Sequence, residues 1–261
     1  MYTHFTLISL LLAAGLFLGM LALIELGRRI GLAKLARDPE GLSKGIGASE
    51  GAIFGLLGLV IAFTFSGAAA RFEGRRQLIT EEVNNIGTAY LRIDVVPDAA
   101  RQELRDLFRR YLDLRIATYA NVENLSEVDR KMAETTALQN IIWTKAVEAC
   151  RRPDIIGRPE AILLPALNQM FDIVTTRKAA TLNHPPPAIY ALLGALSLVG
   201  SLLIGYGSST NKYRPRLHAF VFAAITSLSI LMIIDLEFPR LGFIRVDSSD
   251  QLMVDLRKSI D

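Results

Sequence analysis

The stretch EGAIFGLLGLVIAFTFSGAAARFEGRRQ, residues 50–77, decides how this chain folds. It starts with Glu50, ends in a cluster of arginines, and carries no charge over the twenty residues between Glu50 and Arg71. About 20 helical residues cross the hydrocarbon of a bilayer, so this run is expected to form a membrane-spanning helix. Glycine and alanine are unusually frequent in this run, which raises the question of what these small residues contact.

Three further uncharged runs have the composition of membrane spans: residues 5–24, 187–207 and 219–234. The whole chain agrees with a membrane protein, since 51% of its 261 residues are apolar and its mean hydropathy is +0.33. The first run lacks the basic start of a signal peptide and has full span length, so we interpret it as a retained helix. The sequence therefore predicts four transmembrane helices.

The long connection after the second span is charged and reads as helices. Beyond Arg71, apolar residues recur at steps of three, four and seven positions: Phe72, Ile79, Val83, Ile86, Tyr90 and Ile93. This spacing, uninterrupted by proline until Pro97, predicts that the second span continues as one helix to near Val95. Three more amphipathic stretches follow before residue 187, and no stretch alternates like a strand. The expected fold class is all-α, with a helical soluble domain between spans two and three.

The predicted organisation has four parts. Transmembrane helices one and two occupy residues 1–70, and a helical extramembrane domain occupies residues 71–186. Transmembrane helices three and four occupy residues 187–236, and residues 237–261 form a C-terminal tail.

The second span has a small face and a bulky face on a helical wheel. The small face carries Gly51, Gly55, Gly58, Ala62, Ser66 and Ala69, and the bulky face carries Phe54, Leu57, Ile61, Phe65, Ala68 and Phe72. Small residues let helices approach closely in lipid, so we expect the small face to pack on a neighbouring span. The bulky face would then meet lipid, another subunit or a hydrophobic constriction. An ordinary packing helix is the simpler interpretation, and a pore-lining helix is the alternative.

Two carboxylates, Asp235 and Glu237, lie where the fourth span should end. Alternating spans put them on the same side of the membrane as Arg71, Arg75 and Arg76. Ionisable groups at membrane depth are costly and usually paired. We expect at least one of the two carboxylates to pair with one of these arginines as a charge anchor, and a gate or ion-attracting ring is the alternative.

Catalytic and metal-binding patterns are missing from the sequence. The three histidines lie near different span ends without metal-ligand spacing, and there is no phosphate loop, catalytic triad or dinucleotide fingerprint. Glu81 and Glu82 are expected on a solvated helix face. Cys150 lies beside Arg151 and Arg152, which could lower its pKa, but an inert cysteine is the expected interpretation. We expect no enzyme, no cofactor, no metal and no nucleic-acid partner.

Two segments resemble the signature blocks of the bacterial bestrophin-like domain family. They are residues 50–92, which begin with the opening stretch, and IIDLEFPRLGFIRVD, residues 233–247. That family is remotely similar to bestrophins, which are pentameric anion channels whose second span lines the pore with a hydrophobic neck. The resemblance implies Leu57, Ile61 and Phe65 as neck candidates. The acidic calcium clasp of eukaryotic bestrophins has no counterpart in this sequence.

The resemblance implies an oligomeric membrane ion channel for inorganic anions, with the lipid bilayer and copies of itself as partners. The alternative is a non-conducting membrane scaffold or sensor whose helical domain binds protein partners. The expected location is the bacterial inner membrane. The basic short connections would put the helical domain outside the cytoplasm by the positive-inside rule, whereas the resemblance puts it inside, and we adopt the cytoplasmic orientation.

Overall fold

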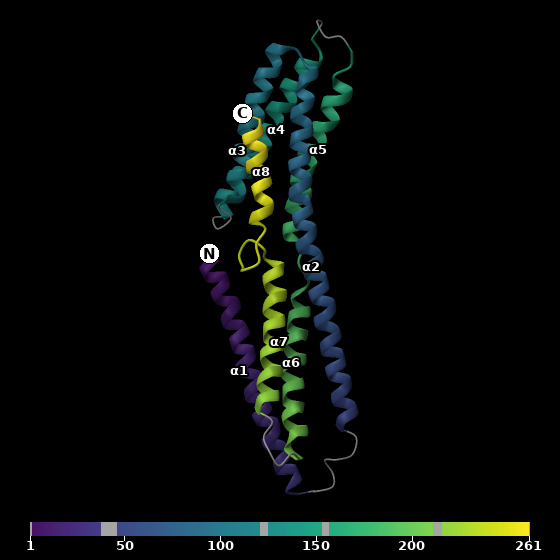
Figure 1. Ribbon diagram of the computed structural model, residues 1–261, viewed down its shortest axis with the longest axis vertical. Coiled ribbons are helices and arrows are strands. Elements are labelled where there is room, and N and C mark those ends of the chain that lie inside the picture. Colours follow the sequence, from purple (N-terminus) through teal and green to yellow (C-terminus); the bar gives the residue numbers. More distant parts are fainter. Residues whose placement is uncertain (1, 38–45, 121–124, 153–156, 211–215, 261) are drawn as a thin grey trace. The chain divides into compact units, whose positions relative to one another are not determined.

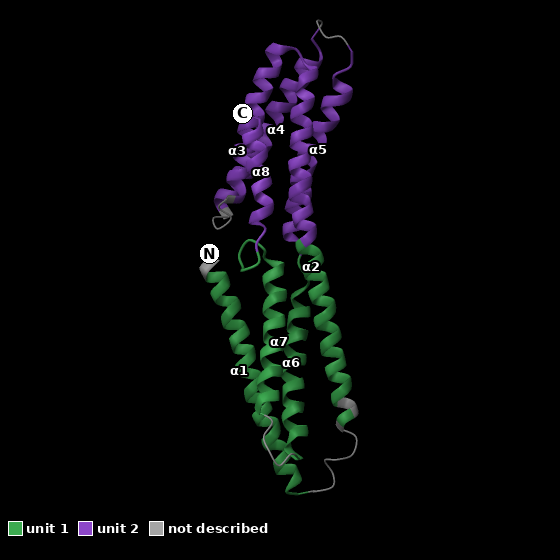
Figure 2. Ribbon diagram, in the orientation of Figure 1, with its two compact units in different colours: residues 1–72, 184–244 green, residues 73–183, 245–261 purple. Residues whose placement is uncertain are grey.

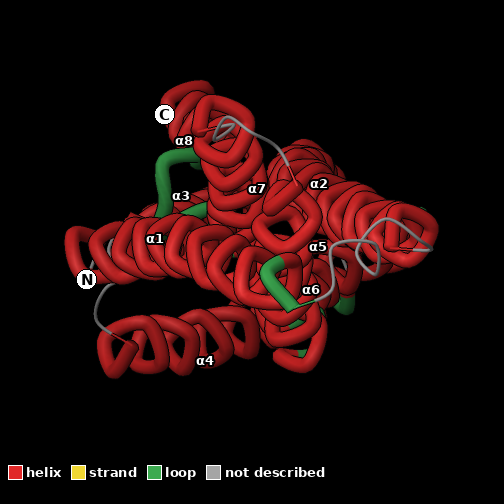
Figure 3. The backbone as a smooth tube through the Cα atoms, turned by 90° about the horizontal axis from the view of Figure 1, so that it is seen from below, coloured by secondary structure: helices red, strands yellow, loops and turns green. Residues whose placement is uncertain are grey.

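A computed structural model describes residues 2–37, 46–120, 125–152, 157–210 and 216–260 of the chain (Figure 1). The α-helices are α1 (Tyr2–Leu35), α2 (Ile46–Arg92), α3 (Asp98–Ala120), α4 (Leu125–Cys150), α5 (Glu160–Leu182), α6 (Pro187–Gly207), α7 (Arg216–Glu237) and α8 (Asp247–Ser259). Two short 3-10 helices are η1 (Ile93–Val95) and η2 (Ser208–Thr210). The described part of the chain contains helices and no strand, which confirms the all-α class (Figure 3).

Four helices are long and apolar enough to cross a membrane, as predicted. The candidate spans are His4–Leu35, Glu50–Val95, Glu160–Thr210 and Arg216–Glu237. The prediction for α2 is also confirmed, because the helix runs without a break to Arg92 and η1 carries it to Val95. Val96 is extended, with φ −98° and ψ 159°. The residue before a proline avoids the helical region, so Pro97 ends the helix.

The chain divides into two compact units (Figure 2). Unit 1 comprises residues 1–72 and 184–244, and therefore holds α1, α6, α7 and the first half of α2. Unit 2 comprises residues 73–183 and 245–261, which are the rest of α2 with α3, α4, α5 and α8. The predicted C-terminal tail, residues 237–261, therefore contributes a helix to unit 2, where Met253 and Ile260 are buried.

Unit 1 is held together by a close approach of α1 and α6. A Cβ atom added to Gly27 would lie 2.0 Å from the carbonyl oxygen of Leu202, and one added to Gly205 would lie 1.9 Å from that of Ile24. Only residues without a side chain allow backbones to come this close, and such contacts drive helix association in lipid. Glycines at both sides of this contact therefore fix how the first and third spans pack.

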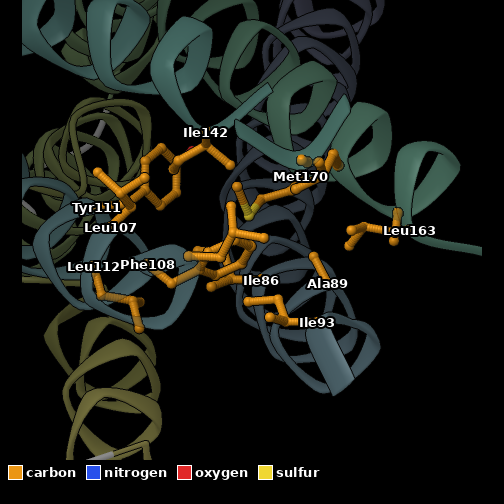
Figure 4. Packing of buried hydrophobic residues seen from close by; sticks show 14 of the residues in the cluster. Ile86, Ala89, Ile93, Leu107, Phe108, Tyr111, Leu112, Ile142, Leu163 and Met170 are labelled. Carbon is orange, nitrogen blue, oxygen red and sulfur yellow. The ribbon is translucent and has the colours of Figure 1, made fainter. Parts of the chain in front are cut away.

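Unit 2 has the core of a soluble helical bundle. Fully buried side chains from α2, α3, α4 and α5 meet in it, among them Ile86, Phe108, Tyr111, Ile142 and Met170 (Figure 4). Burying one such side chain stabilises the fold by roughly 1.5–3 kcal/mol. Ile86 lies on the seam predicted from the sequence, whereas Ala89, which is also buried in this core, was not part of that seam.

Candidate functional site

The bulky face of α2 packs inside unit 1. Leu57 is 3% exposed and Ala68 is 0% exposed. Ile61 packs against a cluster that includes Leu193 of α6 and Ile230 of α7. A side chain buried within one subunit cannot line a passage between subunits. Leu57 is therefore enclosed within this subunit, Ile61 is half-buried, and of the three neck candidates Phe65, 46% exposed, has the most open side chain. The assignment of a neck to these residues stays a prediction.

The small face of α2 points away from the other described helices of the chain. A Cβ atom added to Gly51, Gly55 or Gly58 would meet no atom within 4 Å, and Ala62 and Ser66 are exposed. This face therefore has no packing partner among the described residues of the chain itself, and its expected packing on a neighbouring span stays a prediction. The close glycine packing occurs between α1 and α6 instead.

This outer face of α2, defined as Gly51, Gly55, Gly58, Ala62 and Ser66, differs from the outer faces of the other spans. On α1 and α7 large apolar side chains such as Leu11, Leu18, Phe220 and Ile225 are exposed, and α2 itself exposes Leu56, Leu59 and Phe63 beside its small residues. Large apolar side chains are what a helix presents to lipid tails. A small and uncharged face with a hydroxyl suits a different neighbour, either another protein surface or water.

A charged junction forms where α2 leaves unit 1 and α7 ends. The Nε atom of Arg71 donates to Oε1 of Glu237 over 2.8 Å, and its Nη2 atom contacts the same oxygen. Glu237 is fully buried, and the Arg71 side chain is 26% exposed. A buried carboxylate is tolerated when it is paired and hydrogen-bonded. The sequence predicted a pair between these two groups of residues, and Arg71 with Glu237 is such a pair.

His184 completes this junction. Its Nδ1 atom lies 3.3 Å from Oε2 of Glu237. Its ring stacks on that of Phe238, with centroids 4.6 Å apart and an interplanar angle of 22°. The sequence places His184 near a span end but does not connect it to Glu237, because residues 184 and 237 are too far apart along the chain for any spacing rule.

Asp235 has a role that the sequence did not reveal. Its two carboxylate oxygens accept hydrogen bonds from the backbone N–H groups of Phe243, over 2.8 Å, and Ile244, over 2.6 Å. The carboxylate thus closes the turn that follows α7. Asp235 therefore accepts hydrogen bonds from backbone N–H groups, whereas Glu237 pairs with Arg71.

The other two predicted anchors, Arg75 and Arg76, make contacts within unit 2. Arg75 donates to the carbonyl oxygens of Ala180, over 3.1 Å, and Asn183, over 3.0 Å. Arg76 pairs with Glu73 over 2.9 Å, one helical turn away. Arg75 therefore ties α2 to the end of α5.

A second charged cluster lies inside unit 2. Glu82 is fully buried and accepts from Nε of Arg115 over 2.6 Å, and its other oxygen pairs with Arg177. The guanidinium of Arg177 lies over the ring of Tyr119, 4.0 Å from its centroid. The expectation of a solvated face is thus wrong for Glu82. Its position three residues after the buried Ile79 places it on the core-facing seam, and this spacing was the available signal.

Metal-ligating side chains and the single cysteine were the remaining candidates for chemistry. No cluster of metal-ligating side chains occurs among the described residues. Burial raises the pKa of the Cys150 thiol, and Glu160 raises it further. A raised pKa disfavours the reactive thiolate form, and the inert cysteine stays our prediction.

Solved structures with a similar fold are bacterial membrane proteins. Two are crystal structures of a bacterial Bestrophin homolog from Klebsiella pneumoniae, each with a single substitution. The first has a TM-score of 0.66 and 14% identity, and covers 92% of this chain and 98% of that chain. The second has a TM-score of 0.66 and 12% identity, with the same coverage of 92% and 98%. At these identities the similarity shows a shared fold. No curated protein matches the chain significantly.

A family comparison extends this result to the sequence itself. The matched model describes the Bestrophin-like domain, and the match runs from the first span to α8. It includes both segments that resemble the family's signature blocks. Since residues 14–251 match the Bestrophin-like domain model, the chain belongs to the Bestrophin-like domain family.

Proposed function

We propose that this protein is an oligomeric ion channel that conducts inorganic anions across the bacterial inner membrane. Membership of the Bestrophin-like domain family supports a channel-type function over catalysis. The four spans supply the membrane part of such a channel. The preference for anions rests on the family's remote similarity to bestrophin anion channels.

The outer face of α2 is the observation that carries this proposal. It is small, uncharged and directed away from the chain's own helices. When copies of the chain assemble with this face toward a common axis, the five small residues line the passage between them. A lipid-facing helix has no need of such a face, because lipid tails accommodate large apolar side chains.

Phe65 is the proposed constriction of this passage. It lies beside Ser66 at the edge of the outer face and is 46% exposed. A ring of phenylalanines can block ions by excluding water from a narrow segment, and a polar side chain at the same place should admit water. Leu57 and Ile61 have no part in this revised constriction.

The test is anion flux through the full chain in liposomes, with a matched pair of variants. Phe63 provides the control, because it is 70% exposed on the same helix but lies on the far edge of the outer face. Phe65→Ser is expected to raise chloride flux several-fold, whereas Phe63→Ser is expected to leave it unchanged. Equal changes in chloride flux for the two variants would show that Phe65 does not line the ion path.

If neither the wild type nor Phe65→Ser conducts chloride, the second candidate function, a membrane scaffold or sensor, would be favoured. A specific feature supports considering it: unit 2 has a core of its own, as a partner-binding domain requires. The proposed orientation places this unit in the cytoplasm. Reporter fusions at the carboxyl end and within residues 205–215 test that orientation, because the two sites must report opposite sides.

A further inference from the structure

Glu50, near the start of α2, is a carboxylate with an unsatisfied oxygen. The residue is half-buried, but its Oε1 atom is buried and accepts no hydrogen bond from any described residue. The fully buried carboxylates of Glu82 and Glu237, in contrast, are each paired with arginine. A buried oxygen that loses its water without gaining a partner raises the free energy of the fold. A positively charged ligand at Glu50 would remove this cost.

The carboxylate of Glu50 lies against the end of α6. A Cβ atom added to Gly207, the last residue of α6, would lie 2.7 Å from Glu50 Oε1 and 3.1 Å from Oε2. Only glycine lets both oxygens come this close to the helix. The carboxyl end of a helix carries partial negative charge, because its last carbonyl groups have no N–H partner within the helix. The carboxylate therefore faces a charge of its own sign.

The side-chain donors at this end of α6 are used by carbonyl groups. Ser208 donates its Oγ to the carbonyl oxygen of Gly205 over 2.9 Å. Thr210 donates its Oγ1 to the carbonyl oxygen of Gly207 over 3.2 Å. Arg28 of α1 donates its Nη1 to the carbonyl oxygen of Ser208 over 2.9 Å. These donors satisfy the helix end and not the carboxylate.

The remaining hydroxyl of this segment belongs to Ser209 and is packed against α1. A Cβ atom added to Gly31 would lie 2.4 Å from Ser209 Oγ. The described side chains at the end of α6 thus leave Glu50 Oε1 without a donor. A carbonyl oxygen has two lone pairs, so the carbonyl groups of the last turn can bind an ion while they accept hydrogen bonds.

We propose that Glu50 and the carbonyl oxygens at the end of α6 bind a monovalent inorganic cation of the sodium type. Hard cations prefer oxygen ligands, both carboxylate and carbonyl. One carboxylate among neutral carbonyl groups supplies a single negative charge, which suits a single positive charge. The bound ion would fasten the start of α2 to the end of α6. This site lies within unit 1 and does not depend on whether the protein conducts.

The experiment compares thermal unfolding of the full chain in detergent in sodium chloride and in choline chloride at the same concentration. The wild type should gain about 2–4 °C in Tm in sodium chloride, the shift expected when the ion exceeds its dissociation constant several-fold. Glu50→Gln should lose this gain. Glu25→Gln is the matched control, because Glu25 is an acid of α1 that pairs with Arg29 over 3.1 Å, and it should keep the gain.

A second pair of variants keeps the test decisive if Glu50→Gln folds poorly. Gly207→Ala should also lose the sodium gain, because the added methyl group displaces the carboxylate. Gly194→Ala should keep it, because a Cβ atom added at this position of the same helix meets no atom within 4 Å.

Three results would overturn the cation site. The first is a wild type that is equally stable in both salts, and the second is a sodium gain that survives in both Glu50→Gln and Gly207→Ala. The third is a larger gain in calcium chloride than in sodium chloride at equal ionic strength, which would contradict a monovalent ion. Because unfolding is measured without ion flux, a silent channel would leave each of these results unchanged.

Discussion

Gly242 lies directly against the carboxylate of Asp235: a Cβ atom added to Gly242 would stand 1.9 Å from Asp235 Oδ1. The same carboxylate holds the N–H groups of the next two residues, Phe243 and Ile244. The turn after α7 is thus closed by an acid in the last turn of the span, and only glycine leaves room for it. This contact explains why the segment DLEFPRLG begins with an acid and ends with a glycine.

Replacement of Gly242 should therefore open the turn. Gly242→Ala is expected to lower the free energy of unfolding by about 1–3 kcal/mol, because the carboxylate must move and two partly buried backbone N–H groups lose their acceptor. Thermal unfolding in detergent measures this loss. Gly74→Ala is the control, since a Cβ added there meets no atom within 4 Å. A Gly242→Ala protein as stable as wild type would contradict the turn closure.

Glycines on different spans should respond differently to the same change. Gly205→Ala should prevent stable folding, because its Cβ would lie 1.9 Å from a backbone oxygen of α1, and overpacking of tight contacts costs about 1–3 kcal/mol or more. Gly58→Ala should leave the subunit folded, because no atom of the described chain stands in the way. Yield and monodispersity after purification measure both. Similar losses for the two variants would show that the outer face of α2 is packed after all.

Substitution of the buried Glu82 in unit 2 should destabilise the protein far more than substitution of the adjacent Glu81. Glu82→Gln removes the charge that holds Arg115 and Arg177, and breaking a buried pair costs about 3–5 kcal/mol. Glu81→Gln changes an exposed residue and should alter stability by less than about 0.5 kcal/mol. Chemical unfolding in detergent compares the two variants. Equal stabilities would mean that the cluster around Glu82 contributes little.

Cys150 should react slowly with alkylating reagents. Burial raises the pKa of its thiol, and the thiolate is the reactive form. At a pH near 8 the folded protein should therefore be modified more slowly than the same protein unfolded in denaturant, and the difference should narrow as the pH rises. Mass spectrometry of iodoacetamide-treated samples gives both rates. Faster modification of the folded form would contradict the burial.

The sequence predicted the number of spans and the length of α2, because both follow from runs of uncharged residues and from helical spacing. It could not decide which face of α2 meets the rest of the chain. Lipid tails are as apolar as leucine, so a bulky apolar face is compatible with lipid and with protein contact alike. The small residues Gly27 and Gly31 of α1 lie four positions apart, and this spacing was a usable signal for the α1–α6 contact.

Partners that are distant along the chain were harder to predict. The sequence shows that Asp235 is a carboxylate near a span end, but its partners are backbone N–H groups, which carry no sequence signal. Glu82 was missed for a different reason. Acidic side chains are usually solvated, so Glu82 was expected on an exposed face. Its position on the helical seam between the buried residues Ile79 and Ile86 places it in the core instead.

The most direct test of the proposed function is the reversal potential of the purified full chain in a planar bilayer under a potassium chloride gradient. An anion channel with its constriction at Phe65 should give currents that reverse near the chloride equilibrium potential, with a larger conductance for Phe65→Ser than for wild type and no increase for Phe63→Ser. Currents that reverse at the potassium equilibrium potential would contradict anion conduction. No current from wild type or from Phe65→Ser would contradict the channel itself.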